Sequence, residues 1–571
     1  MKRKRAKPVY KEYTMGQIML LPVDLDEIIP ANHLVRVISE FVERMDLSCL
    51  EAKYKGGGTS SYHPKMMLKV YLYSYTQKIF SSRRIAKGLR ESIPFMWLSG
   101  NNRPDFRTIN YFRGHILKGL IEKIFVELLL LLIEEGYIKL EDYFVDGTKL
   151  EANANKYSFV WAKSTAYYEK QLAEKVKGLF EEIERLNTAE DAHYGERDLE
   201  EVGEAGAVTA EKMAQRVGEL NERLKKEGSE TEAEDEHGPH DQQPPKKEEQ
   251  AEPLSKQIED KLTQAKQQQE HNPHNQAIAK AAKALEEECL PRAKKYEDQK
   301  QKLAGRNSYS KTDVDATFMR MKEDAMKNGQ LKAAYNIQIG TENQFVVGFS
   351  LHQEAGDTNC LIPHLEKVKG WLEKLPLHVV SDAGYGSEEN YAYLDREKVG
   401  NYLKYAGFDR EQKKRFKPDP FKAENMPYDA EKDEFTCPNQ QPVKYVTTRK
   451  EKTKNGYWTE QRVYVCSNCQ GCALKDTCTK ADKRQMRVNF QLWKYRQQAR
   501  ENLLSPEGQR LRSQRGVDVE TVFGRLKENW GFRRFLLRGL KKVTIEWGLI
   551  CMAHNLAKVW SAHNDLELSV V

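Results

Sequence analysis

The stretch LHVVSDAGYGS, residues 377–387 of this 571-residue chain, decides the fold class. Val379 and Val380 are typical of a buried strand, which ends at Asp382 before a glycine-rich turn. A helix is expected to follow at 387–397. The other elements expected nearby are a strand pair at 335–340 and 345–351, a helix at 361–372 and a strand at 402–405. This alternation of strands and helices predicts an α/β fold with a mixed sheet flanked by helices.

A second β-type run lies within LEDYFVDGTKL at 140–150, where Tyr143, Phe144 and Val145 lead to its expected end at Asp146, before Gly147 and Thr148. Asp146 and Asp382 are therefore both expected where a strand ends, beside small residues that let a ligand approach the backbone closely. If the two strands are neighbours, the two carboxylates converge.

Glu520 is the candidate for a third carboxylate, on a helix expected over residues 506–529. Lys527, seven residues later, falls on the same face two turns further on. Three such carboxylates can bind two Mg²⁺ ions about 3.5 to 4 Å apart, as in nucleases and polymerases. Asp142 and Asp518 are the nearest substitutes, although Asp518 is expected to point away from the face of Lys527.

The net charge of the chain is +7, but residues 484–542 alone hold fifteen Lys or Arg against five Asp or Glu. Aromatic residues such as Trp493 and Trp530 are interspersed among these charges. A segment of this kind can bind phosphates and stack on bases, whereas a solvated helix usually balances its charges. The pattern indicates a nucleic acid as the partner.

Membrane association is not expected. The apolar run at 128–133 is far shorter than the roughly 18 residues that a membrane-spanning helix needs. The basic N-terminus lacks the apolar region of a secretory signal. These features predict a cytoplasmic protein without a membrane partner.

Five of the nine cysteines fall within residues 437–478, a grouping that favours a metal site over disulfides. Four of them can form a tetrahedral, structural Zn²⁺ site, namely Cys437, Cys469, Cys472 and Cys478. Cys466 can replace one of the four. The alternatives are an iron–sulfur cluster, for which the usual next spacing and proline are missing, and reduced cysteines without metal.

The order of these patterns predicts five parts. A helical domain for DNA binding or dimerisation is expected at 1–135. The mixed sheet is divided between 136–163 and 306–407, and its C-terminal part, with the helix of Glu520, covers 484–571. Two insertions interrupt it, a helical arm at 164–305 and the cysteine-rich segment at 408–483.

Two of these parts carry further candidates. In the arm we expect two long helices and a disordered polar tip, whose histidines are a weaker candidate for metal binding: His237, His240, His271 and His274. In the N-terminal domain, basic and amide residues are typical of a helix-turn-helix-like DNA reader or equally of a solvated helical face. They are Arg83, Arg84, Arg90, Arg103, Arg107, Asn110 and Arg113.

Three motifs, taken in order, make the chain resemble a DDE transposase of a bacterial insertion sequence, which has a ribonuclease-H-like catalytic core. They are YFVDGTKLEA at 143–152, HVVSDAGYGS at 378–387 and VETVFGRLKENWGFRRFLLRG at 519–539. The helical N-terminal stretch between 14 and 113 is similar to the domain that precedes the core in this group. The resemblance covers most of the chain apart from the arm.

The resemblance implies that Asp146, Asp382 and Glu520 are catalytic and bind two Mg²⁺ or Mn²⁺ ions. It also implies that Lys527 contacts the transposon end. The basic residues expected to join it on DNA are Arg515, Arg525, Arg533, Arg534 and Arg538. Related enzymes often have an arginine four residues before the glutamate, where this chain has Gly516, and Arg515 stands one residue earlier.

The implied activity is cleavage and transfer of DNA strands. A homodimer or higher synaptic complex would bind double-stranded DNA at the terminal inverted repeats, cut it, and join the 3′ end to target DNA. One alternative is a Mg²⁺-dependent nuclease without strand transfer. Another is a non-catalytic, zinc-containing DNA-binding protein, against which the presence of all three acids weighs.

Overall fold

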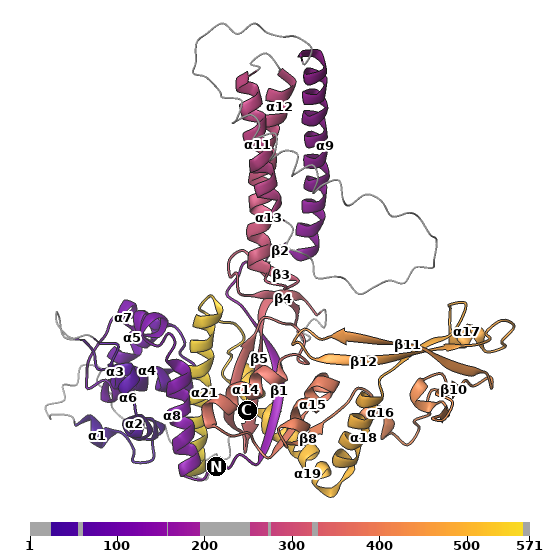
Figure 1. Cartoon of the computed structure of the whole chain (residues 1–571). Coiled ribbons are helices and arrows are strands. Elements are labelled where there is room, and N and C mark those ends of the chain that lie inside the picture. The colour runs from indigo at the N-terminus through magenta and orange to yellow at the C-terminus, as the bar shows by residue number, and fades with distance from the viewer. Residues whose placement is uncertain are drawn as a thin grey trace, which may run out of the picture. The chain divides into compact units, whose positions relative to one another are not determined.

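The computed structural model describes residues 24–54, 61–156, 158–194, 252–271, 276–321 and 329–563. The chain divides into two compact units, one of Met1–Val160 with Arg306–Val571 and one of Trp161–Gly305 (Figure 1). The predicted polar tip and its histidines His237, His240 and His274 lie outside the described residues, as does the side chain of His271. Among the described helices, none combines the length and apolar composition that crossing a bilayer requires.

The N-terminal region is helical, as predicted. Its helices are α1 (Leu25–Ile28), α2 (Leu34–Arg44), α3 (Ser48–Glu51), α4 (Pro64–Thr76), α5 (Ser82–Glu91), α6 (Ile93–Leu98), α7 (Phe106–Tyr111), the π-turn η1 (Phe112–Ile116) and α8 (Ile121–Glu134). Asp105 caps α7 by accepting a hydrogen bond from Thr108 N at 2.7 Å. Arg113, one of the predicted DNA-reading residues, is instead buried, 3.4 Å from Glu546. It stabilises the core and is not exposed to DNA.

A six-stranded mixed sheet forms the core, with β1 at its centre. β1 pairs antiparallel with β5 on one side and parallel with β7 on the other. β4 and β6 pair with β5, and β8 pairs parallel with β7. The bounds are β1 (Asp142–Glu151), β4 (Thr317–Arg320), β5 (Leu331–Glu342), β6 (Phe345–His352), β7 (His378–Ser381) and β8 (Gly400–Leu403). The fold is therefore mixed α/β, as predicted.

Helices cover this sheet. α14 (Leu361–Leu372) packs on β6, and α21 (Leu540–His563) packs on β6 and on the N-terminal helices α4 and α8. α21 is buried along most of its length, which explains why its sequence is apolar on more than one side. It joins the N-terminal helices to the sheet in one core.

A continuous helical segment follows Ser505, whose Oγ accepts a hydrogen bond from Gly508 N at 3.0 Å. Two π-turns replace the regular α-helical geometry within this segment. Its parts are α19 (Pro506–Arg515), η5 (Gly516–Glu520), α20 (Thr521–Gly524) and η6 (Arg525–Asn529). It agrees with the helix predicted over 506–529 in its bounds, but not in its regularity.

The cysteine-rich segment contains a second, antiparallel sheet in the order β13-β12-β11-β10-β9. Its strands are β9 (Tyr428–Asp429), β10 (Glu434–Thr436), β11 (Pro442–Lys452), β12 (Trp458–Cys466) and β13 (Gln485–Val488). The other described elements outside the helical arm are two short strands, five short helical segments and the longer helix α18. They are β2 (Phe159–Trp161), β3 (Ser308–Ser310), η3 (Ala383–Tyr385), α15 (Glu388–Arg396), α16 (Phe408–Glu411), η4 (Ala423–Asn425), α17 (Lys475–Cys478) and α18 (Phe490–Leu504).

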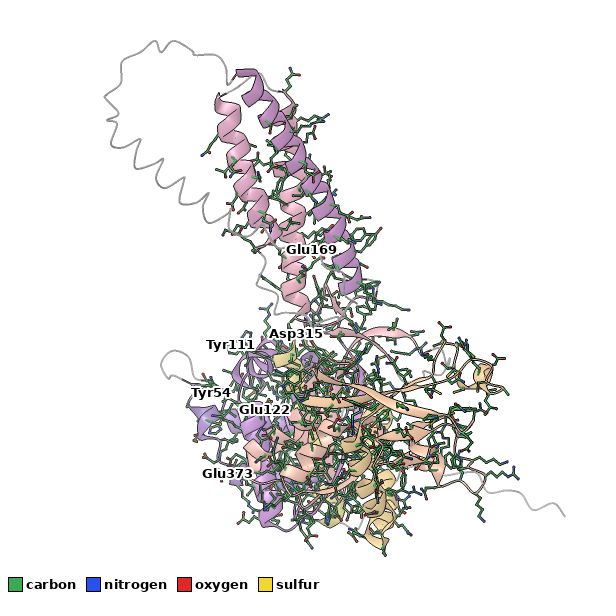
Figure 2. All side chains as sticks on the ribbon, turned by 45° about the vertical axis from the view of Figure 1, so that its right-hand side comes forward. Tyr54, Tyr111, Glu122, Glu169, Asp315 and Glu373 are labelled. Atoms are coloured by element: carbon green, nitrogen blue, oxygen red, sulfur yellow. The ribbon has the colours of Figure 1, made fainter. Side chains whose placement is uncertain are left out.

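The second unit is a bundle of packed helices, not the pair that the sequence predicts. Its helices are α9 (Ala162–Tyr194), α11 (Leu254–His271), α12 (Gln276–Ala284), the π-turn η2 (Leu285–Cys289) and α13 (Leu290–Leu303). Leu172 and Val176 of α9 are buried against Ile258 of α11 and Leu285 of η2. Glu169, labelled in Figure 2, pairs with Lys300 of α13 at 2.5 Å. The stretch expected as one helix from 254 folds back on itself, because this buries its apolar stripe.

Candidate active site

The register of β1 and β7 brings the two predicted aspartates together. Phe144 of β1 is the partner of Val380 of β7, so Asp146 and Asp382, each two residues further on, come side by side at the same edge. The Asp146 side chain is 11% exposed and the Asp382 side chain 46%. Asp146 is therefore held within the sheet, whereas Asp382 opens to solvent.

Backbone N–H groups orient both carboxylates. Oδ1 of Asp146 accepts a hydrogen bond from Gly147 N at 2.9 Å. Oδ1 of Asp382 accepts one from Gly384 N, also at 2.9 Å, and so caps the 3₁₀ turn η3. One carboxylate oxygen of each aspartate is thus oriented by the backbone.

Arg515 of α19 joins all three predicted acids. Its Nη2 lies 3.4 Å from Asp146 Oδ1 and 3.9 Å from Asp382 Oδ2. Its Nη1 lies 3.0 Å from Glu520 Oε1. The three carboxylates therefore surround a single cation, and the Arg515 side chain is only 13% exposed.

The π-turn η5 explains how Arg515 reaches this position. Gly516 occupies the place where related enzymes often have arginine, and Arg515 lies five residues before Glu520 rather than four. A π-turn contains one extra residue and pairs residue i with i+5, so Arg515 and Glu520 share a face across Gly516–Glu520. The π-turn therefore compensates for the longer spacing between the arginine and the glutamate.

The second π-turn carries Lys527, which lies beside β1. Its Nζ donates a hydrogen bond to Thr148 Oγ1 at 2.7 Å, two residues along the strand from Asp146. Arg533, Arg534 and Arg538 follow and are exposed. Nε of Arg538 donates to Asn153 O at 2.8 Å, just beyond the end of β1.

The Arg525 guanidinium packs inside the protein and is not in a position to contact DNA. Its guanidinium stacks on Trp530, 5.4 Å from the ring centroid, and its Nη1 is buried without a hydrogen-bond partner. Burial lowers the pKa of Arg525 to about 10. Arg525 therefore differs from the predicted DNA-binding residues, because its guanidinium packs against the protein interior.

Asp357 is a fourth carboxylate at this edge, which the sequence did not single out. Its Oδ1 accepts hydrogen bonds from Asn336 Nδ2 at 2.8 Å and Gln338 Nε2 at 2.9 Å, both on β5. A Cβ added to Gly147 would lie 2.4 Å from Asp357 Oδ1. Close contact between Asp357 and the strand of Asp146 therefore depends on a glycine at 147.

Tyr385 links these acids. Its hydroxyl donates a hydrogen bond to Gln338 Oε1, and Gln338 in turn holds Asp357. Burial raises the pKa of Tyr385 well above its usual value, and the nearby aspartates raise it further, namely Asp357, Asp146 and Asp382. Its proton therefore stays on the hydroxyl and orients the site.

The two substitute acids lie elsewhere. Asp518 is 2% exposed and accepts a hydrogen bond from Gln344 N at 2.9 Å, so it faces the β5–β6 turn and not the site. Burial raises its pKa. Asp142 is the first residue of β1, about 13 Å from Asp146 at roughly 3.3 Å per residue. β1 continues to Glu151, so Asp146 lies inside the strand and not at its end, where the sequence predicts it.

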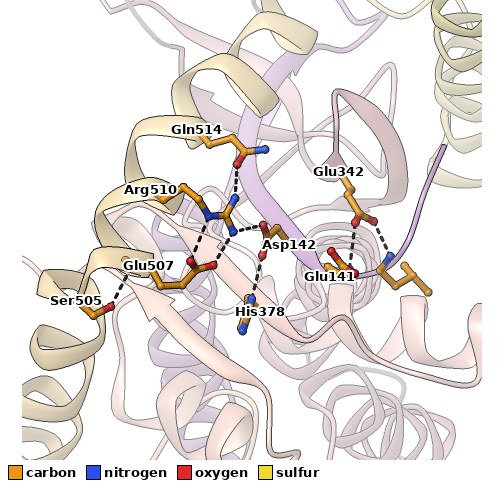
Figure 3. Close-up of polar contacts among 10 residues, drawn as sticks. Glu141, Asp142, Glu342, His378, Ser505, Glu507, Arg510 and Gln514 are labelled. Atoms are coloured by element: carbon orange, nitrogen blue, oxygen red, sulfur yellow. Dashed lines mark hydrogen bonds and ion pairs between the residues drawn. The ribbon is translucent and has the colours of Figure 1, made fainter. Parts of the chain in front are cut away.

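Asp142, His378 and Glu507 form a group whose ligand atoms lie within 4.8 Å of one another (Figure 3). A cation already occupies it, because Arg510 Nη2 lies 2.5 Å from Asp142 Oδ2 and 2.6 Å from Glu507 Oε1. His378 Nδ1 lies 2.9 Å from the other oxygen of Asp142. Arg510 thus links α19 to the starts of β1 and β7, at the end of β7 opposite to Asp382.

The five clustered cysteines lie near one another as free thiols. Burial raises the pKa of Cys478. Three neighbouring thiols raise it further, namely Cys469, Cys437 and Cys472. Burial also raises the pKa of Cys466, to about 12. Within the described ranges no three of these sulfurs lie within 4.8 Å of one another, so they are gathered but not in ligand positions.

Comparison with protein families gives two matches. Residues 436–560 match the model of the transposase DDE domain, and residues 23–115 match that of the transposase domain DUF772. The two matches together support a DDE transposase of an insertion sequence. The first match contains Glu520 and Lys527, and the second contains most of the N-terminal helices of the transposase. No curated protein and no solved structure matches the transposase.

Neither match includes Asp146 or Asp382. The two aspartates are assigned to the site by geometry, because both lie within 4 Å of the guanidinium that also contacts Glu520. The matched glutamate segment of the transposase and the two unmatched strands thus meet at one place.

Proposed function

We propose that this transposase binds the terminal inverted repeats of its insertion sequence and catalyses metal-dependent DNA cleavage and strand transfer at Asp146, Asp382 and Glu520. The observation that carries the proposal is the convergence of these acids on Arg515 from two parallel strands and a helix. We propose further that the mixed sheet is a ribonuclease-H-like core, interrupted by the arm and by the cysteine-rich segment. The proposed location is the cytoplasm, beside the nucleoid.

The donor atoms at the site fit Mg²⁺ or Mn²⁺, since they are carboxylate oxygens, which such hard cations prefer. Asp146, Asp382 and Glu520 would hold two ions. When bound, the ions supply positive charge that activates the attacking oxygen and stabilises the leaving oxygen. Arg515 keeps the three acids together by balancing part of their charge.

Two reactions can use this arrangement in turn. Hydrolysis adds water across a phosphodiester and leaves a 3′-hydroxyl and a 5′-phosphate. In strand transfer, that hydroxyl displaces a 3′ oxygen of the target strand, so one bond forms as another breaks. Lys527, whose Nζ donates a hydrogen bond to Thr148 Oγ1, would hold a phosphate near the reacting one.

The exposed arginines beyond Lys527 extend the DNA contact. Three arginines lie past the end of β1, the strand that Lys527 contacts. They are Arg533, Arg534 and Arg538. Their charges would neutralise the phosphates of the transposon end. A homodimer or higher synaptic complex would hold two such ends and the target DNA.

We also propose a structural Zn²⁺ held by Cys437, Cys469, Cys472 and Cys478. Thiols are suitable donors, and Cys478 is near the other three. Two sulfurs already accept backbone N–H groups, Cys437 from Gln441 at 3.3 Å and Cys469 from Arg484 at 3.4 Å. Such hydrogen bonds stabilise thiolate ligands and favour metal over unmodified thiols.

The test is a cleavage and joining assay on DNA from the edges of the element that encodes the chain, with Mg²⁺ or EDTA. The variant Glu520→Gln should lose cleavage by more than about a hundredfold, because one metal-holding carboxylate is gone. The control Glu373→Gln changes an exposed glutamate (Figure 2) remote from the acids and should act like wild type.

The outcomes separate the candidate functions. Joined products that require Mg²⁺ and disappear in Glu520→Gln support the transposase activity. Cleavage without joining supports a nuclease instead. Binding without cleavage in any metal contradicts the catalytic proposal and favours a DNA-binding protein without catalysis.

A further inference from the structure

A large groove lies beside the mixed sheet, apart from the residues assigned above. One wall is the segment 405–425, which includes α16 and η4, and the other is α18 (Figure 1). Phe408 of α16 packs on Leu503 of α18, which holds the two walls together. The groove has a volume of about 1280 Å³. This exceeds the roughly 300–1,000 Å³ of small-molecule pockets and favours a macromolecular ligand.

The lining of the groove is basic. Of its nineteen residues, seven are Lys or Arg and four are Asp or Glu. The α18 residues at its wall recur every three or four positions, as in Trp493, Arg496 and Arg500, so one helical face is directed into it. Lys413 and Lys417 face it from the other wall and are exposed.

Most of these charges lack a carboxylate partner. Among the seven basic residues, all within the described part of the chain, only Arg496 forms an ion pair, with Glu424 at 3.0 Å. Nε of Arg496 is buried without a hydrogen-bond partner. Elsewhere the structure pairs many basic side chains with acids, for example Arg510 with Asp142 and Glu507. An unbalanced basic groove is what an anionic ligand requires.

The groove begins at the edge of the sheet that carries the acids. β8 lies parallel to β7, and Leu403 at its end is the partner of Ser381, which precedes Asp382. Lys404 N donates to Ser381 O at 3.3 Å, and Tyr405, the next residue, lines the groove. A Cβ on Gly386 would lie 2.6 Å from Lys404 O, so the turn after Asp382 packs against the entrance.

The aromatic residues of the groove are already engaged in packing. Trp493 packs edge-to-face on Phe490 with centroids 5.4 Å apart, and also on Phe435. Phe416 is covered by the guanidinium of Arg410, 5.7 Å from its centroid. Each ring therefore already has an intramolecular partner, whereas proteins commonly bind single strands by stacking bases on free aromatic faces. The lining suits a phosphate backbone instead.

We propose that this groove binds the phosphate backbone of duplex DNA on the side of the scissile bond that leads past Asp382 and the end of β8. The inference rests on the proposed function, since it takes the three acids as the point from which the duplex extends. The groove would give the transposase a second DNA contact, separate from Lys527 and the arginines after it.

The test measures binding of a random-sequence duplex at several salt concentrations in EDTA, so that the metal site does not contribute. The variant Lys413→Ala/Lys417→Ala should bind roughly tenfold more weakly, and the slope of log K against log salt should fall by about 2. The control Lys139→Ala/Lys374→Ala removes two exposed lysines before β1 and β7, at the opposite edge of the sheet. It should match wild type.

Arg500→Ala, on the α18 wall, should reduce the slope by about 1 and so report on the groove independently of the loop. Equal losses in the groove variants and the control, or no loss in the groove variants, would overturn the proposal. A loss confined to single strands, or to binding of an acidic peptide such as residues 229–252, would also overturn it.

The groove proposal and the catalytic proposal can be contradicted independently of each other. If Glu520→Gln binds duplex normally and wild type cuts no DNA in any metal, the catalytic proposal fails while a salt slope lowered in the groove variants still supports the groove. If wild type cuts and joins DNA while the groove variants bind duplex with an unchanged slope, only the groove proposal fails.

Discussion

Arg515 and Glu520 are five residues apart, and Nη1 of Arg515 lies 3.0 Å from Oε1 of Glu520. In a regular α-helix, side chains at this separation point about 140° apart. The π-turn Gly516–Glu520 inserts one residue and turns both to the same side. The helix can thus bring an arginine and a glutamate together to Asp146 in β1 and to Asp382 at the end of β7.

Replacing Arg515 should change how the protein responds to metal. In Arg515→Gln the three acids lose their shared cation, and we expect the melting temperature in EDTA to fall, because an unpaired, partly buried carboxylate costs about 1–3 kcal/mol. Mn²⁺ should then raise the melting temperature of the variant more than that of wild type, since the ion replaces the lost charge. Thermal unfolding with and without Mn²⁺ measures both effects.

The matched control is Arg510→Gln on the same helix. Arg510 also pairs with two acids, Asp142 and Glu507, but at the other end of β1. It should lower the melting temperature in EDTA without increasing the response to Mn²⁺. If both variants respond alike, the metal binds at the Asp142 group or at neither, and the assignment of the site is wrong.

Asp357 should contribute to cleavage by positioning the site. Its Oδ1 is held by Asn336 and Gln338, and it touches the backbone at Gly147 beside Asp146. In Asp357→Asn we expect cleavage to fall by about 10- to 100-fold, as for residues that orient metal ligands, and the Mg²⁺ concentration for half-maximal rate to rise. Cleavage rates against Mg²⁺ concentration provide the measurement.

Glu354→Gln is the control for Asp357→Asn, because it lies in the same loop and contacts Asn359. It should leave the Mg²⁺ dependence unchanged. A purely structural role for Asp357 would lower the rate at all Mg²⁺ concentrations without shifting the half-maximal value, and that result would contradict its place beside the metal ligands.

The sequence was sufficient to predict the parts of the site that depend on strand ends. Val379 and Val380 marked a buried strand, and Asp382 followed it, so a carboxylate at the sheet edge was expected. The position of Glu520 followed from helix signals at Ser505 and from its spacing to Lys527. These features are local, since hydrophobic pattern and capping determine them over a few residues.

Long-range contacts could not be predicted in the same way. Arg515 was uncertain because a π-turn leaves no clear signal in residue spacing, and only the backbone shows that Gly516 is the extra residue. Asp357 stands in a loop, and its role depends on β5 lying beside β1. Arg525 was predicted to face DNA because it lies in a basic segment, but packing against Trp530 turned it inward.

Zinc content should follow the identity of the cysteines. We expect wild type to bind about one Zn²⁺ per chain, and Cys472→Ser to lose it, because a tetrahedral site needs four ligands. Removal by a chelator should lower the melting temperature of wild type and leave that of Cys472→Ser unchanged. Elemental analysis together with thermal unfolding measures this.

Two further cysteine variants make the zinc assignment specific. Cys466→Ser should keep the ion, because the Cys466 thiol donates a hydrogen bond to Asn468 O and is not one of the four proposed ligands. Cys49→Ser, in the N-terminal helices, should also keep it. Loss of zinc in Cys466→Ser with retention in Cys472→Ser would show that the alternate set of ligands is the correct one.

His554 on α21 should make stability depend on pH. It is 2% exposed, and its ring bonds to Gln344 O at 2.9 Å through Nε2, which therefore carries the proton. Burial lowers the pKa of His554 to about 3.

The neutral form of His554 therefore stabilises the folded state, because the fold resists protonation of this ring. The stabilisation is present above about pH 6.5 and is lost as the pH falls toward about 3. Between pH 7.5 and 5.0 the free-energy difference between wild type and His554→Gln should therefore shrink by about 2 kcal/mol, as measured by urea unfolding. A constant difference would mean that the pKa of His554 is the same in the folded and unfolded states.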